Sequence, residues 1–244
     1  MKSYLSLVPI SAKVRKRQNR MTILCVIISI FLVTAIFSVA DMMIRTQSDR
    51  MTGKNGSWHI ELDGISQETA LKIAERDDVV SIGAVTIFNP DGELPYRMDG
   101  KRVVLYGIDE SYLTMNSTGA AEGRFPQGMG EIMLSSNAAR VLQVAVGDTV
   151  TLRTPSGDWD FTVSGLGGVE ESYYSGQYSL MDAYLPRTAF AALMEQNNVH
   201  NLQTSYYVQF TSASKAAKAI PELTAQHNLP ENAVSENTGV MAIA

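Results

Sequence analysis

Few residue types in this chain occur at spacings that support known chemistry. The three histidines are His59, His200 and His227, and none of them has another His or Cys three or four residues away. A transition-metal site needs several such ligands at short, regular spacings. The sequence therefore predicts no metal site, and these histidines are expected to be ordinary strand or surface residues.

Two dipeptides come close to catalytic or nucleotide-binding motifs without completing them. Ser164-Gly165 lacks the glycine two residues before the serine that a nucleophile elbow requires. Gly53-Lys54 lacks the glycine five positions earlier that a phosphate-binding loop requires. We therefore expect no catalytic residue and no bound cofactor in this chain, and the chain itself is not expected to be an enzyme.

A group of tyrosines in the sequence can be interpreted in two ways, as a binding surface or as part of the core. Tyr173, Tyr174 and Tyr178 lie close together in a segment rich in Gly and Glu, and Tyr184 follows. Exposed tyrosines of this kind can form a surface for a substrate or a partner. Tyrosines also fill the cores and hairpin faces of β-rich domains, and the sequence alone leaves both interpretations open.

Composition narrows the class of protein. The chain has 244 residues, of which 45% are apolar and 18% charged, with one Cys and a formal net charge of −5. That apolar fraction is enough for a packed core. One Cys excludes an intramolecular disulfide framework, and the negative charge argues against a nucleic-acid partner.

The charge is divided unequally along the chain. Residues 1–40 contain six Lys and Arg and no acid, so 14 of the 20 basic residues and all 25 acidic residues follow. Met21–Ala40 has no charge, Pro or Gly. At about 1.5 Å per residue, a helix of this length matches the thickness of a bilayer core, about 30 Å. We assign residues 21–43 to a transmembrane helix.

The flanking charges predict how this helix is oriented. Basic residues between Arg15 and Arg20 precede the helix and Asp41 follows its apolar part. The positive-inside rule then places the N-terminus in the cytoplasm and residues 41–244 on the extracytoplasmic side of the plasma or inner membrane. A cleaved signal peptide is the alternative, since Ser38-Val39-Ala40 resembles a cleavage site, but the apolar run is longer than signal sequences use. Residues 1–20 are expected to form a basic amphipathic segment on the cytoplasmic surface of the bilayer, or a disordered basic tail.

The pattern downstream of residue 44 mixes strands and helices. Strands are predicted at 57–62, 79–88, 102–108, 131–134, 149–153, 159–166 and 205–210, from their alternating or β-branched residues. A further strand is predicted to begin at Tyr184 and to lead into a helix. Helices are predicted at about 66–76, 135–142, 188–196 and 212–220, the last one ending at Pro221. The order predicts an α+β domain over 44–244 with two subdomains, outside the membrane.

Three stretches together resemble one family. The first is the basic segment leading into the apolar span, KVRKRQNRMTILCVIISIFLV. The second is Val104–Asp109, VLYGID, and the third is Glu122–Leu152, EGRFPQGMGEIMLSSNAARVLQVAVGDTVTL. Their order and spacing resemble the FtsX-like and MacB-like permeases of ABC transporters, with the first membrane helix followed by the MacB-like extracytoplasmic core domain. The match covers the start of the chain and about residues 83–166.

The resemblance implies structural roles for the residues of the third stretch. They are Gly123, Arg124, Phe125, Pro126 and Glu131 in the loop and following strand, and Gly147 and Asp148 in the later turn. Residues 167–204 match less clearly and are interpreted as a variable inserted subdomain.

The resemblance also implies a function and partners. The chain is expected to be a permease subunit that couples ATP hydrolysis by a separate cytoplasmic ABC ATPase to export, or to mechanical work outside the membrane. Its partners would be that ATPase, a second permease copy or homologue, and the lipid bilayer. Such permeases have further membrane helices, so the sequence is expected to be a fragment. A single-pass surface receptor or adhesion module is the main alternative, and an anchored hydrolase the third.

Overall fold

The computed structural model describes residues 16–116, 120–167, 180–230 and 232–242, and the chain divides into two compact units, residues 1–50 and 51–244. The first unit is described by helix α2 (Lys16–Asn55), whose last turn belongs to the second unit. Its part from Lys16 to Met43 is long and apolar enough to cross a membrane, with a mean hydropathy of 2.9 in its most apolar window and none of that window buried. The predicted span, residues 21–43, lies within this part of α2.

Hydroxyl side chains inside the apolar segment bond to the helix itself. Thr22, Ser29 and Thr34 each donate to the carbonyl oxygen four residues earlier, at 3.1, 2.8 and 2.8 Å. These bonds satisfy the polar groups without a partner outside the helix. The segment therefore remains compatible with an apolar surrounding.

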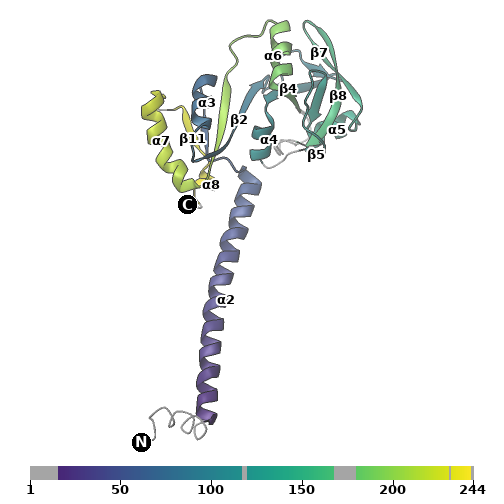
Figure 1. The fold of residues 1–244 in the computed structure, drawn as a ribbon. Coiled ribbons are helices and arrows are strands. Elements are labelled where there is room, and N and C mark those ends of the chain that lie inside the picture. The colour runs from purple at the N-terminus through teal and green to yellow at the C-terminus, as the bar shows by residue number, and fades with distance from the viewer. Residues whose placement is uncertain (1–15, 117–119, 168–179, 231, 243–244) are drawn as a thin grey trace, which may run out of the picture. The chain divides into compact units, whose positions relative to one another are not determined.

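The second unit contains two subdomains built on one continuous sheet (Figure 1). The first subdomain has strands β1 (Ile60–Leu62), β2 (Val79–Phe88), β10 (Thr204–Phe210) and β11 (Val234–Glu236), with helices α3 (Gln67–Ala74) and α7 (Ala213–His227). The strand order is β11-β1-β10-β2, and each neighbouring pair is antiparallel. Each helix thus links two parallel strands with a third between them, which is the split βαβ arrangement.

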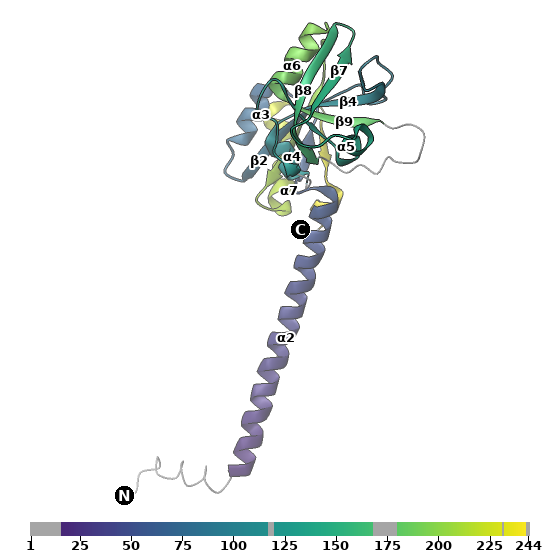
Figure 2. The same cartoon turned by 90° about the vertical axis from the view of Figure 1, so that its right-hand side faces the viewer.

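The second subdomain interrupts the chain between β2 and β10. Its strands are β3 (Arg97–Met98), β4 (Lys101–Ile108), β5 (Ala120–Gly123), β6 (Glu131–Leu134), β7 (Thr149–Thr154), β8 (Gly157–Gly167) and β9 (Met181–Pro186). The pairings run β4-β3-β7-β8-β6-β9, and β9 returns to pair in parallel with β4. Six strands therefore close into a barrel, and Figure 2 shows β9 beside β4. Among the described residues each of these six strands pairs with two others of the barrel, and β2 and β5 pair in addition with β4 and β8.

Apolar side chains fill the barrel. Val103, Leu105, Ile132, Val163 and Leu185 are fully buried in one cluster that lines its interior. The barrel is therefore packed rather than hollow, as expected for so few strands. Short helices α4 (Glu110–Met115), α5 (Ser136–Leu142) and α6 (Arg187–Gln196) follow strands β4, β6 and β9 respectively, and α8 (Thr238–Met241) follows β11.

The α+β fold class is confirmed, and most predicted elements lie within two or three residues of their expected bounds. Ser66 and Ser135 cap α3 and α5 by accepting hydrogen bonds from the backbone N–H three residues later. Sequence reasoning missed α4, β3, β5, β11 and α8, which are all six residues or shorter.

One helix boundary was predicted wrongly. Pro221 was expected to end the helix that begins after Ser212, but α7 continues through it to His227. Proline removes one backbone hydrogen bond, yet Ala219 and Leu223 on either side are fully buried against the sheet. Their packing outweighs the lost bond. The helix ends instead at Asn228, which takes the left-handed conformation with φ of 48°.

Candidate functional site

The loop that carries the family resemblance is organised around one carboxylate. Arg124 donates to both oxygens of Glu131, with an Nη1–Oε2 distance of 2.8 Å. The backbone N–H groups of Gln127 and Gly128 also donate to Oε2, at 2.8 and 3.2 Å. A single carboxylate at the start of β6 therefore holds the loop by four charge-assisted hydrogen bonds, two of which come from the charged guanidinium.

The same loop lies directly on strand β8. The N–H of Arg124 donates to the carbonyl of Ser164 at 2.9 Å, and Gly123 has a φ of 72°. A Cβ atom on Gly165 would lie 2.4 Å from the carbonyl oxygen of Arg124. Pro126 is buried, and Phe125 packs against the cluster that contains Tyr184. The loop thus packs closely against strand β8 of the barrel, with little space between the two backbones.

The later turn of the motif, at Gly147 and Asp148, is held by hydrogen bonds to backbone groups. Gly147 has a φ of 97°, and its N–H donates to the carbonyl of Val163 at 2.8 Å. The Asp148 carboxylate accepts from the N–H of Ala145 at 2.8 Å. These contacts turn the chain from α5 into β7.

The ion pair in the loop predicts a pH dependence of stability. Arg124 and the loop N–H groups lower the pKa of Glu131 from 4.5 to about 2. A carboxyl whose pKa is depressed on folding stabilises the fold above its unfolded pKa, and this contribution disappears as the pH falls through the folded value. Glu131→Gln is expected to melt at a lower temperature than the parent at pH 6. The difference should shrink as the pH falls from about 4.5 towards about 2. Thermal melts of both chains across this range test it, with exposed Glu75→Gln as control. An equal difference at every pH would contradict the prediction.

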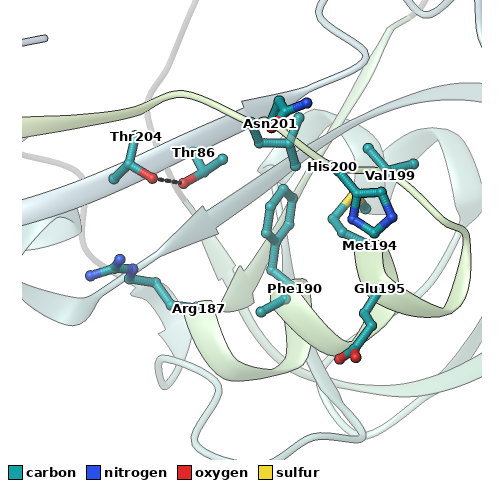
Figure 3. Close-up of a pocket in the computed structure, with 11 residues that line it drawn as sticks. Thr86, Arg187, Phe190, Met194, Glu195, Val199, His200, Asn201 and Thr204 are labelled. Carbon is teal, nitrogen blue, oxygen red and sulfur yellow. Dashed lines mark hydrogen bonds between the residues drawn. The ribbon is translucent and has the colours of Figure 1, made fainter. Parts of the chain in front are cut away.

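A groove of about 400 Å³ lies where the two subdomains meet (Figure 3). One wall is α6, which contributes Phe190 and Met194, and the facing wall is the segment from Val199 to Thr204. Thr86 on β2 hydrogen-bonds Thr204 on β10, with 2.7 Å between the hydroxyl oxygens. Since β2 and β10 are the strands that connect the subdomains, the groove spans this connection. Sequence reasoning found α6 but not the groove, because the segment before β10 has no regular pattern.

A second group of polar residues lies on the sheet of the first subdomain. Tyr207 donates to Glu61 at 2.8 Å and sits between the rings of Trp58 and Tyr112, with centroids 4.8 and 5.0 Å away. Burial raises the pKa of the Glu61 carboxyl, and burial, with the neighbouring Tyr112 and Glu61, raises the pKa of the Tyr207 hydroxyl. The alternation in 57–62 predicted that Glu61 lies on the face opposite Ile60 and Leu62. The rings of Tyr207 and Tyr112 beside it come from distant parts of the sequence, so the local pattern could not predict them.

Asn237 joins two segments that are distant in sequence. Its Nδ2 donates to the carbonyl oxygens of Asn55 and Trp58, both at 2.9 Å. Its backbone N–H donates to the carbonyl of His59 at 2.9 Å, and its Oδ1 caps α8. The residue is 5% exposed. The end of α2 and the segment around α8 are therefore tied together at one buried side chain.

The tyrosines singled out in the sequence do not form one described site. Tyr173, Tyr174 and Tyr178 lie outside the described residues. Tyr184 is buried and stacks on Tyr106 with centroids 4.9 Å apart, so it belongs to the core. Within the parts of the chain that the structure describes, no three His, Cys, Asp or Glu residues come together as a metal site.

The histidines have separate surroundings. His59 is buried, and its Nδ1 accepts from the N–H of Phe210 at 3.1 Å. Burial lowers the pKa of His59. His200 is exposed beside Asn198, and His227 is the last residue of α7.

Comparisons with known proteins place the fold. The periplasmic region of MacB from Actinobacillus actinomycetemcomitans matches with a TM-score of 0.55 and 16% identity, over 80% of this chain and 94% of that one. The extracellular domain of the transporter YknZ from Gram-positive bacteria matches with a TM-score of 0.50 and 16% identity, over 73% and 98%. These likenesses show a shared fold. A search of curated proteins found no significant match.

A family model gives the stronger assignment. The model described as the MacB-like periplasmic core domain matches residues 21–226. The match begins at the apolar part of α2 and runs through both subdomains, so it covers most of the chain. The chain therefore belongs to the MacB-like periplasmic core domain family.

Proposed function

We propose that this chain is part of the permease subunit of an ABC transporter. The observation that carries the proposal is the continuous family match from an apolar helix into the core domain, over residues 21–226. On this view α2 crosses the cell or inner membrane and residues 41–244 lie outside it. The six basic residues before residue 21 favour a cytoplasmic N-terminus.

The proposed activity is mechanical coupling. A separate cytoplasmic ATPase binds and hydrolyses ATP, and the permease, paired with a second copy or a homologue, converts this into export or into work outside the membrane. The chain contributes a membrane anchor and a domain with two connected subdomains. It supplies no catalytic group to ATP hydrolysis.

Purification from native membranes tests this proposal. The tagged protein, solubilised in mild detergent, is expected to bring down an ABC ATPase and to show ATP hydrolysis sensitive to vanadate. A second experiment uses the double variant Cys25→Ala, Lys218→Cys in the same cells. Its single thiol, at an exposed position, should react with a membrane-impermeant maleimide in intact cells. A preparation without any ATPase would contradict the transport proposal and favour a single-pass receptor. Labelling only after cell lysis would contradict the orientation.

A further inference from the structure

Helix α6 presents one face to the groove with a charge at each end. Arg187, Phe190, Ala191, Met194 and Glu195 all line it, and their spacing of three and four residues places them on one side of the helix. The charged residues are eight positions apart, which corresponds to about 12 Å along the helix axis. Figure 3 shows Arg187 at one end of the groove and Glu195 at the other.

Within the described part of the chain neither charged side chain has an ion-pair partner, although Arg187 attracts the nearby Asp109 carboxylate at longer range. No ion pair among the described residues includes Arg187 or Glu195. The guanidinium of Arg187 lies 6.0 Å from the centre of the Tyr206 ring. The nearby carboxylate of Asp109 accepts hydrogen bonds from the N–H groups of Ala84 and Tyr112. Arg187 therefore keeps its donors for a ligand.

Between the charges the floor of the groove is apolar, and its polar lining consists of His200, Asn201 and the pair Thr86 and Thr204 beside the connecting strands. Phe190 and Met194 are 4% and 3% exposed and form the floor. Thr86 and Thr204 share a single hydrogen bond, so one of the two hydroxyl hydrogens is left over from that pair. A hydroxyl with a free hydrogen can donate to an anion that Arg187 attracts.

We propose that this groove binds a short zwitterionic molecule with an apolar middle. Its anionic group contacts Arg187, its ammonium group contacts Glu195, and its apolar part lies on Phe190 and Met194. An extended peptide of four residues with free ends has this pattern, because four residues reach about 13 Å at 3.3 Å each. The site goes beyond the proposed function, since binding needs no ATPase and no movement across the membrane.

Titration calorimetry on the full chain in phospholipid nanodiscs tests the proposal, with empty nanodiscs as the blank. The probe is the peptide Ala-Leu-Leu-Ala in four forms: free at both ends, acetylated, amidated, and blocked at both ends. The free form is expected to bind most tightly. Blocking either end should weaken binding about fivefold to tenfold, as removal of a charge-assisted contact does.

Two variants connect each peptide end to one residue. Arg187→Gln should remove the preference for a free carboxylate and keep the preference for a free ammonium group, and Glu195→Gln should do the reverse. Both side chains are at least partly exposed, so the fold is expected to survive. Lys218→Gln and Glu75→Gln, exposed residues outside the groove, are the charge-matched controls and should change neither preference.

Three results would overturn the proposal. They are no binding of the free tetrapeptide, equal binding of its free and doubly blocked forms, and variants that alter both preferences alike. Tighter binding of a doubly blocked peptide of twelve residues would also overturn it, in favour of a protein segment as the occupant. None of these results bears on whether an ATPase co-purifies, so the two proposals fail separately.

Discussion

Replacing Asn237 with Ala is expected to lower the free energy of unfolding of residues 51–244 by about 2–4 kcal/mol. The side chain is buried and donates to the carbonyl oxygens of Asn55 and Trp58. Its loss leaves these carbonyls without that donor and removes the cap of α8. Urea unfolding of the full chain, followed by the fluorescence of Trp58 and Trp159, measures the change.

Two further variants separate the amide donor from other effects. Asn237→Asp keeps the shape and the cap but points a carboxylate at two carbonyl oxygens, so it should destabilise at least as much as Ala. Asn232→Ala removes an exposed amide from the same segment and should change stability by less than about 0.5 kcal/mol. An Asp variant as stable as the parent would rule out the donor role of Nδ2.

The second large effect is expected at Gly165. A methyl group there would lie 2.4 Å from the carbonyl oxygen of Arg124, and 3.1 Å from its backbone nitrogen and carbonyl carbon. Because these are backbone atoms, the loop or β8 has to move. Gly165→Ala is expected to destabilise the fold by about 2–4 kcal/mol. The same urea experiment measures it.

Gly130→Ala is the matched control for this substitution. It lies in the same loop region, and a Cβ atom there would meet nothing within 4 Å. Its effect should stay within about 0.5 kcal/mol. Equal effects of the two substitutions would mean that the loop moves to accommodate the added methyl group at little cost. The close contact between the loop and β8 would then not be required for stability.

Local patterns in the sequence predicted elements better than they predicted pairing. A continuous segment without charge, Pro or Gly identified α2, and serine caps identified the start of α3 and α5, because these signals are local in the sequence. The barrel depends on β9 meeting β4 in parallel, with Leu105 opposite Ala183. No local pattern carries that information. The same is true of the α7 helix at Pro221, where tertiary packing outweighs a local preference.

The candidate sites show the same division. The loop around Glu131 could be named from sequence because its residues are nearly contiguous, and the resemblance drew attention to them. The groove could not, since Thr86, Arg187 and Thr204 come from three separate stretches of the chain. The helix that carries Phe190 and Met194 was predicted from residue 188, one residue after Arg187, but only the facing wall turns its face into a groove.

The strand order also determines when each subdomain can form during synthesis. Every pairing that closes the barrel lies between Arg97 and Pro186. In contrast, β1 and β2 are both completed by β10, which begins at Thr204. At about 5–20 residues per second, β1 waits on the order of ten seconds for this partner. The barrel is therefore able to fold while β1 and β2 still lack their central strand, and the subdomain that begins first in the chain is finished last.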